Sequence, residues 1–302
     1  MNCEIGLLDT EKRNAKTLHL DEMSALEIAQ TMNAEDSIVV RAIKDKLPEI
    51  SKAMELCASA YQSGGRIIYM GAGSSGRYAV ADAVECPPTF GVKKTTFTAI
   101  LAGGHRAIWN SVEGAEDDID AARKDIVKIK LNPKDVFIGL AASGRTPYVI
   151  EGLVLAKKVG CKTITISCNQ TALIAKYADI AINVLCGPEV ITGSTRLKSG
   201  TAEKLVLNMI STGAMVRSGK VYQNLMVDVV QSNEKLRARA IRIVMEATGC
   251  DEGLAAERLK ESDGFCKVAI TSILLNCSVN EARIALKKNG GFVHKAVEGI
   301  KR

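Results

Sequence analysis

The stretch RIIYMGAGSSGR, residues 66–77, carries the clearest signal for the fold of this chain. Its first five residues, 66–70, are Arg66 followed by a short apolar run with two isoleucines, which is typical of a buried strand. Three glycines in the pattern GxGxxG follow at once, and this pattern marks a strand that turns directly into a helix. The stretch therefore predicts a β-strand, a tight turn and a helix in immediate succession.

Further apolar runs continue this pattern along the chain. They lie at Thr96–Leu101, Val136–Ala141, Thr163–Ser167 and Ile180–Leu185, and helical patterns of ten or more residues separate most of them. Strands that alternate with helices form βαβ units and a parallel sheet that is covered on both faces. We therefore predict an α/β fold of three layers, in which helices flank a five-stranded parallel sheet.

The remaining sequence divides the chain into three parts. Residues 1–56 form an N-terminal segment with helices, because apolar residues recur there at helical spacing. Residues 57–220 form the sheet domain, which a long helix at about Thr195–Ser218 closes. Residues 236–302 contain only helical patterns with glycines between them, which predicts a small all-helical C-terminal domain.

Composition limits the classes of function. The 40 Lys and Arg residues exceed the 34 Asp and Glu residues by six, and this charge is spread evenly. Only 12 residues are aromatic, so the stacking platform of a nucleic-acid binder is not expected. There is no apolar run long enough to span a membrane and no secretory signal, so we expect a cytoplasmic protein. The nine cysteines lack metal-binding spacing, and we expect no metal and no other cofactor.

The loop after the first predicted strand has the residues of an anion-binding site. A dinucleotide site would also need an acidic residue at the end of the second strand, but residues 100–104 read ILAGG. What remains is a glycine-rich turn whose backbone N–H groups converge at a helix N-terminus, where an anion is favoured. The groups that we expect to bind phosphate there belong to Ser74, Ser75, Gly76 and Arg77.

Two further loops have the same character. One follows the third strand and contributes Ser143, Gly144, Arg145 and Thr146, and the other opens the closing helix and contributes Ser194, Thr195 and Lys198. Hydroxyl-rich loops at neighbouring strand ends favour a ligand with a phosphate and several hydroxyls, which is a sugar phosphate. The alternative that Ser-Gly pairs merely begin helices stays open.

Two glutamates are candidates for acid–base chemistry. Pro87 and Pro88 should end the helix that begins at the glycine loop, so Glu85 would lie at its C-terminus, where the pKa of a carboxyl is raised. Glu116 precedes a helical pattern at Ile119–Lys130, where the carboxylate form is favoured. Two carboxyls with pKa values shifted in opposite directions are typical of an acid–base pair.

These residues together resemble the bacterial N-acetylmuramic acid 6-phosphate etherases of the sugar isomerase (SIS) superfamily. The resemblance extends from about Leu8 to at least Gly249. Its blocks are Gly71–Arg77, Glu85–Gly91, Leu101–His105, Ala115–Asp117, Ala141–Tyr148 and Gly187–Lys198. Several blocks in the right order are far more specific than GxGxxG alone.

The resemblance implies an SIS fold and a carbon–oxygen lyase that cleaves the D-lactyl ether of N-acetylmuramate 6-phosphate in peptidoglycan recycling. It implies a homodimer with the active site near the subunit interface, and it assigns the catalytic roles to Glu85 and Glu116. It leaves open which residues cross that interface, which glutamate acts first, what the C-terminal domain does, and whether His105 or Glu189 takes part. The alternatives are an SIS-type sugar-phosphate isomerase and a non-catalytic sugar-phosphate sensor.

Overall fold

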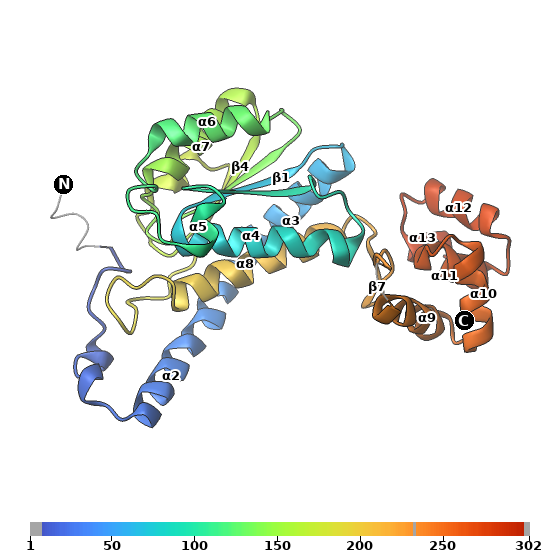
Figure 1. The fold of residues 1–302 in the computed structure, drawn as a ribbon, viewed down its shortest axis with the longest axis horizontal. Coiled ribbons are helices and arrows are strands. Elements are labelled where there is room, and N and C mark those ends of the chain that lie inside the picture. Colours follow the sequence, from blue (N-terminus) through green and yellow to red (C-terminus); the bar gives the residue numbers. More distant parts are fainter. Residues whose placement is uncertain (1–7, 232–233, 299–302) are drawn as a thin grey trace. The chain divides into compact units, whose positions relative to one another are not determined.

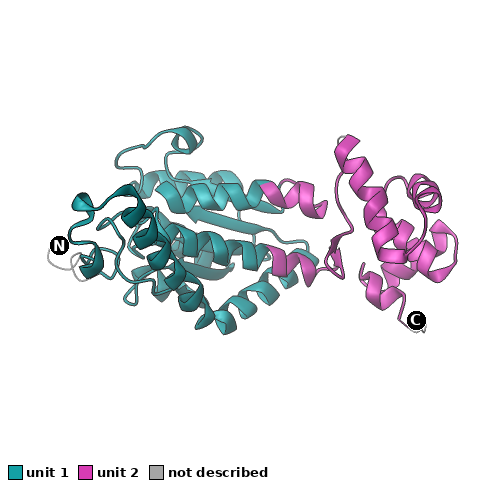
Figure 2. Cartoon of the chain, turned by 90° about the horizontal axis from the view of Figure 1, so that it is seen from below, with its two compact units in different colours: residues 1–84, 95–211 teal, residues 85–94, 212–302 magenta. Residues whose placement is uncertain are grey.

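The computed structural model describes residues 8–231 and 234–298. The chain forms two compact units, which Figure 2 shows in different colours. Unit 1 extends to Val84 and continues from Thr95 to Ser211, whereas unit 2 takes Glu85–Lys94 together with the chain from Thr212 onward. The domain boundaries expected from the sequence stay predictions, because compactness does not show which segments fold independently.

A five-stranded sheet forms the centre of unit 1. Its strands are β1 (Ile67–Gly71), β2 (Phe97–Leu101), β3 (Val136–Leu140), β4 (Lys162–Ser167) and β5 (Ile180–Asn183). All neighbouring strands are parallel, and their order is β2-β1-β3-β4-β5. Each strand ends within two residues of the position that the apolar runs predict, so the predicted sheet is confirmed.

Helices cover both faces of this sheet (Figure 1). One layer contains α6 (Ile119–Ile129) and α7 (Pro147–Val159), and the other contains α3 (Leu47–Gln62), α4 (Gly73–Phe90) and α8 (Lys198–Val216). The central strands β1 and β3 are buried along their whole length, which explains why they read as continuous apolar runs. The predicted three-layer α/β architecture is therefore confirmed.

Other elements of unit 1 surround this sandwich. Two short turns, η1 (Ala15–Thr17) and η2 (Leu20–Glu22), precede α2 (Ala25–Lys44). The four-residue helix α5 (Arg106–Trp109) follows β2, and η3 (Leu173–Tyr177) follows β4.

Unit 2 is mostly helical. A short hairpin of β6 (Val221–Tyr222) and β7 (Leu225–Met226) precedes the helices α9 (Glu234–Thr248), α10 (Glu252–Glu261), α11 (Cys266–Leu275), α12 (Val279–Lys288) and α13 (Val293–Ala296). Their apolar sides form one core, and a capping box of Ser278 and Glu281 opens α12. Within the described parts of both units, no helix is long and apolar enough to span a membrane.

The strand order determines where a ligand is expected. The chain places β2 on one side of β1 and β3 on the other, so the order reverses between β1 and β3. In parallel sheets, ligands bind at the carboxyl ends of the strands at this kind of switch point. The loops that follow β1 and β3 are the two main phosphate loops predicted from the sequence.

Candidate active site

The loop after β1 is tight because glycines allow its strand and helix to approach each other. β1 ends at Gly71, and α4 begins at Gly73, whose φ is +52°. A Cβ atom on Gly76 would lie only 2.7 Å from the Gly71 carbonyl oxygen, so a larger residue could not occupy this turn. The first N–H groups of a helix have no partner within the helix. Ser74 and Ser75 therefore present backbone and hydroxyl donors together at the start of α4.

The loop after β3 lies beside the first loop, because Gly71 and Leu140 are paired in the sheet. Gly144 has a φ of +69°, and a Cβ atom there would lie 2.7 Å from the Cα of Ala172. The Arg145 N–H group donates a hydrogen bond to the hydroxyl oxygen of Ser143, 3.3 Å away. Thr146 then precedes Pro147, the first residue of α7. Only glycine fits the turn that connects this strand with its helix.

A small cavity of about 180 Å³ connects the first loop with the acidic turn before α6. Gly73, Arg77, Glu113 and Glu116 contribute to its lining. The Glu116 carbonyl oxygen also accepts a hydrogen bond from the Tyr148 N–H group at 3.0 Å, which ties this turn to the start of α7. The structure thus brings Glu116 together with the loop after β1. Among the described residues, no group of three His, Cys, Asp or Glu side chains is placed to hold a metal ion.

The environment of Glu116 differs from the expected one. Asp118 caps α6 by accepting a hydrogen bond from the Ala121 N–H group, so Glu116 lies two residues before the cap and outside the helix. Partial burial raises the pKa of Glu116, and the negative charges of Asp117 and Glu113 raise it further. The expectation that a helix N-terminus favours the carboxylate form of Glu116 is therefore wrong, because burial and the neighbouring carboxylates both favour the protonated form.

The expected position of Glu85 at a helix end is also wrong. Helix α4 contains Pro87 and Pro88 in its interior and continues to Phe90. Each proline removes one N–H donor, but its fixed φ is compatible with a helix. The Gly91 N–H group donates to the Pro87 carbonyl at 2.9 Å and closes the last turn. Glu85 is an exposed residue of the part of α4 that belongs to unit 2, and it lies five positions before Phe90, the last residue of the helix.

Arg77 is held by backbone carbonyl groups. Its Nε donates to the Ala107 oxygen at 2.9 Å, and its Nη2 donates to the Asn110 oxygen at 3.1 Å. These bonds fix the short helix α5 against the start of α4. Arg77 also lines the cavity, so its positive charge is available to attract an anion there.

The start of α8 is stabilised by carboxylates of the chain itself. Glu189 is completely buried, and its carboxylate accepts hydrogen bonds from the N–H groups of Lys198 and Ser199. The Lys198 ammonium group forms a buried ion pair with Glu35. Ser194 and Thr195 lie, partly buried, in the turns before this helix. The N-terminus of α8 thus already holds an anion, which is the side chain of Glu189.

One polar residue of this region was not anticipated. Glu203 on α8 is completely buried, and burial raises its pKa to about 8, although the Ser75 hydroxyl opposes this shift. Its position follows from the helical period, since Ala202, Val206, Leu207 and Ile210 on the same helix are also buried. A glutamate within this apolar face was the signal that could have identified it.

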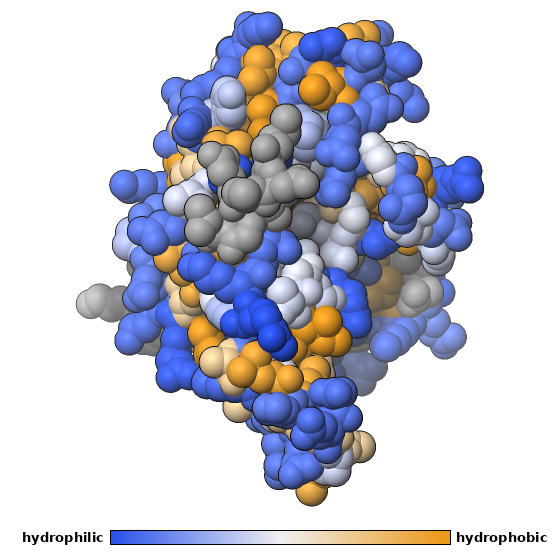
Figure 3. Space-filling view, turned by 90° about the vertical axis from the view of Figure 1, so that its left-hand side faces the viewer, coloured by the Kyte–Doolittle hydropathy of each residue, from blue (hydrophilic) through white to orange (hydrophobic). Residues whose placement is uncertain are grey.

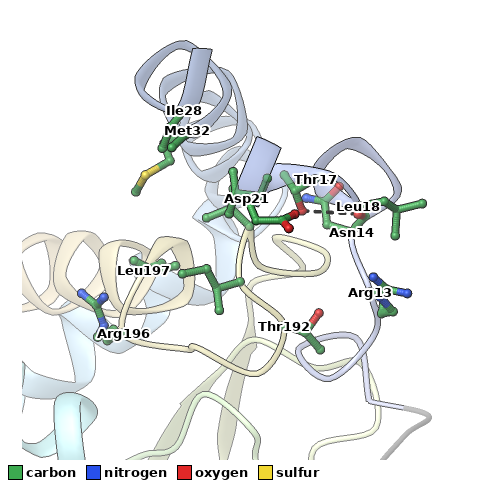
Figure 4. Close-up of a pocket in the computed structure, with 13 residues that line it drawn as sticks. Arg13, Asn14, Thr17, Leu18, Asp21, Ile28, Met32, Thr192, Arg196 and Leu197 are labelled. Carbon is green, nitrogen blue, oxygen red and sulfur yellow. Dashed lines mark hydrogen bonds between the residues drawn. The ribbon is translucent and has the colours of Figure 1, made fainter. Parts of the chain in front are cut away.

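A second, larger cavity of about 540 Å³ lies beside the N-terminal segment (Figure 4). Ile28 and Met32 of α2, together with Leu197, are among the residues that line it. None of the residues predicted for the site contributes to this lining. The face on the side of the N-terminal segment is largely hydrophilic, with separate hydrophobic patches (Figure 3). The smaller cavity is the better candidate, because Arg77 and Glu116 of the predicted site line it together with Gly73 at the start of α4.

Comparisons with known proteins agree with this geometry. Residues 49–157 match the N-terminal SIS domain of glucokinase regulatory protein, and residues 118–212 match the SIS domain family. An N-acetylmuramic acid 6-phosphate etherase from Geobacillus sp. (strain WCH70) is 54% identical over 96% of this chain and 99% of its own length. The etherase from Pasteurella multocida (strain Pm70) is 50% identical over 98% of this chain and 99% of its own length.

The fold is also similar to that of a solved structure. A protein from Bacteroides fragilis, assigned as a phosphosugar isomerase involved in capsule formation, superposes with a TM-score of 0.52. It covers 67% of this chain and 95% of its own length at 20% sequence identity. At this identity the likeness concerns the fold alone.

Proposed function

The chain belongs to the N-acetylmuramic acid 6-phosphate etherase family, and from this premise we propose how its residues perform the reaction. The protein is a carbon–oxygen lyase that cleaves the D-lactyl ether of N-acetylmuramate 6-phosphate. The products are N-acetylglucosamine 6-phosphate and D-lactate, and the reaction serves peptidoglycan recycling. The observation that carries the residue assignment is the cavity in which the start of α4 and Glu116 lie together.

The phosphate group binds at the switch point of the sheet. The first turn of α4 supplies N–H groups and the hydroxyls of Ser74 and Ser75, and Arg77, which follows this turn, lines the cavity. The neighbouring loop supplies Ser143 and Thr146, with Gly144 and Arg145 shaping the turn. Ser194 and Thr195 complete the polar surroundings before α8. Binding of the remote phosphate orients the reacting carbons of the sugar.

The chemistry starts with the open-chain aldehyde of the sugar, because its C2 proton is acidified by the adjacent carbonyl group. Glu116 removes this proton as general base, and Glu85 as general acid protonates the lactyl oxygen while the C3–O bond breaks. D-lactate leaves, and a C2–C3 double bond conjugated with the aldehyde remains. Water then adds a hydroxyl group to C3 and a proton to C2, with the roles of the two glutamates reversed. A raised pKa makes Glu116 a stronger base.

The assembly and location of the enzyme are part of the proposal. We propose a homodimer with the active site near the subunit interface. Two apolar residues of α2 support this proposal, since Leu26 and Val40 are 67% and 66% exposed and are available to a second copy. We place the enzyme in the cytoplasm. No disulfide joins the cysteines of the described part of the chain, which fits a reducing compartment.

A direct assay tests the proposed function. The purified enzyme is incubated with N-acetylmuramate 6-phosphate, and released D-lactate is measured with a D-lactate dehydrogenase. We expect D-lactate and N-acetylglucosamine 6-phosphate in equal amounts. When the reaction is run in D₂O, we expect one deuterium at C2 of the sugar product. A ketose phosphate in place of D-lactate would indicate an isomerase, and binding without turnover would indicate a sensor. Light scattering of the same sample measures the oligomeric state.

A further inference from the structure

Glu203 is a buried carboxyl for which the proposed mechanism has no role. It lies on α8 within unit 1, and its side chain is completely inaccessible to solvent. Neither of its carboxyl oxygens accepts a hydrogen bond of good geometry from any residue that the structure describes. An unpaired carboxylate in this position would be very costly, so the group needs either a proton or a partner.

Two contacts place Glu203 next to the first turn of α4. Gly200 on α8 lies against the Tyr78 ring, so closely that a Cβ atom there would be 2.6 Å from a ring carbon. The Tyr78 hydroxyl also donates a hydrogen bond to the Arg196 carbonyl oxygen at 3.2 Å. Glu203 lies one turn after Gly200 on α8, and Ser75 lies one turn before Tyr78 on α4. The Ser75 hydroxyl acts on the Glu203 carboxyl as a hydrogen-bond partner would.

The charges around Glu203 favour its neutral form. Burial raises the pKa of this carboxyl to about 8, and the Ser75 hydroxyl offsets only part of the rise. Of the lysines on α8, Lys198 is paired with Glu35, and Lys204 is exposed to solvent. From the segment after β4, Cys168 faces the carboxyl, and its thiol is neutral because the Cys186 thiol and burial raise its pKa. Glu203 therefore carries a proton at neutral pH.

We propose that Glu203 is a positioning residue for the phosphate of the substrate, because its carboxyl O–H group donates to the Ser75 oxygen. The Ser75 hydrogen then points away from α8 and toward the bound phosphate. Once Glu203 loses its proton it can only accept hydrogen bonds. The Ser75 hydroxyl then donates its hydrogen to the Glu203 carboxylate. The lone pairs of the Ser75 oxygen now face the substrate phosphate, and the negative charge of Glu203 lies behind them, so both repel the phosphate. This proposal rests on the proposed function, in which the first turn of α4 binds the phosphate.

Kinetics as a function of pH test this role. The KM and kcat for N-acetylmuramate 6-phosphate are measured between about pH 7 and about pH 9.5, where the phosphate is already a dianion. For the wild type we expect KM to rise at least about fivefold across this range, with a smaller change in kcat. Glu203→Gln keeps a donor without a titratable proton, so its KM should stay low and independent of pH.

An apolar substitution completes the series. Glu203→Met removes the donor and should raise KM about five- to tenfold at every pH while kcat changes little. Lys204→Met, on the exposed side of the same helix, is the matched control and should behave as the wild type does. A rise of KM with pH in Glu203→Gln equal to that of the wild type would overturn the proposal. An unchanged KM in a folded Glu203→Met variant would do the same.

The design separates this proposal from the function on which it rests. If the wild type released no D-lactate, the proposed function would fail. The dissociation constant of N-acetylglucosamine 6-phosphate would then be measured in place of KM. The probe is the fluorescence of Trp109, the single tryptophan, which belongs to α5, the helix whose Ala107 lines the cavity. If Ser75→Ala bound the ligand as tightly as the wild type, the phosphate assignment of α4 would fail together with the role of Glu203. If only Glu203→Gln deviated from its expectation, Glu203 alone would be wrongly assigned.

Discussion

The Lys198 ammonium group lies 2.6 Å from Oε2 of Glu35, and both side chains are almost completely buried. Glu35 also accepts hydrogen bonds from Lys16 at 2.9 Å and from Asn14 at 2.8 Å. Burial alone would raise the pKa of Glu35, but the hydrogen bonds from Lys198, Lys16 and Asn14 lower it to about 2. This carboxylate therefore joins α8, α2 and the N-terminal segment of unit 1.

Removal of the lysine tests the strength of this connection. Lys198→Met leaves a buried carboxylate without its main partner and should destabilise the fold by about 3–5 kcal/mol. Urea unfolding measures the loss, and the double variant with Glu35→Leu should recover most of it. A Lys198→Met variant of wild-type stability but weak phosphate binding would contradict the structural role.

The same carboxylate predicts a dependence of stability on pH. The folded pKa of Glu35 is lower than its usual value near 4.5, so its contribution is complete above that value. The contribution is lost as the pH falls from about 4.5 toward about 2. Thermal unfolding should show that Glu35→Gln removes part of this acid sensitivity.

Glu85 is expected to act as the general acid. Glu85→Gln removes the transferable proton without changing the size of the side chain, so kcat should fall by about 10²- to 10⁴-fold while substrate binding persists. Calorimetry measures binding, and the D-lactate assay measures turnover. Glu257→Gln, an exposed glutamate of the same unit, is the control and should keep full activity. A Glu85→Gln variant with nearly normal kcat would refute the assignment.

The neighbours of Glu116 should set the acidic limb of the pH profile. A general base must be ionised to act, so kcat/KM rises with pH through the raised pKa of Glu116. Asp117→Asn removes one of the charges that raise this pKa, and the acidic limb should move to lower pH. Asp120→Asn changes an exposed carboxylate inside α6 and should leave the limb in place. A limb that stays in place in Asp117→Asn would show that Glu116 does not control it.

The turn at Gly144 should tolerate no side chain. A Cβ atom would collide with Ala172, and the φ of +69° adds strain, so Gly144→Ala should shift the loop and raise KM severalfold. Gly187→Ala is a matched control, because its φ of +71° is similar but no atom lies within 4 Å of the added Cβ. That variant should lose only about 1–2 kcal/mol of stability and keep its KM. Equal effects of the two substitutions would mean that strain, and not the contact with Ala172, is decisive.

The sheet was predictable because its central strands are buried on both faces. Such strands must be apolar throughout, so the runs at Ile67–Gly71 and Val136–Leu140 stand out from the flanking helices. The glycine loops were predictable for a similar reason, since tight strand–helix turns exclude other residues. Both features depend on residues that are close together in the sequence, so they can be predicted without knowledge of tertiary contacts.

Partners distant in the sequence were not predictable in this way. Lys198 was expected to contact phosphate, but the structure places it on Glu35, which lies 163 residues away. Local rules were also incomplete for α4, because two prolines reduce hydrogen bonding but still allow a helix through Phe90. The shift in the pKa of Glu116 depends on how deeply the folded turn buries its carboxyl group and how near the turn brings Asp117 and Glu113. Each of these outcomes depends on tertiary contacts or on loop geometry.

The division of the chain into units also limits how the gene can be shortened. Unit 2 includes Glu85–Lys94, whose Pro88 carbonyl oxygen accepts a hydrogen bond from the Val230 N–H group at 3.4 Å. Phe90 and Val92 are buried in this stretch. A fragment that stops before Thr212 would keep these apolar residues but lose the rest of the compact unit to which they belong. The helical unit is therefore no removable module, and such a fragment should accumulate as insoluble protein even though its sheet is complete.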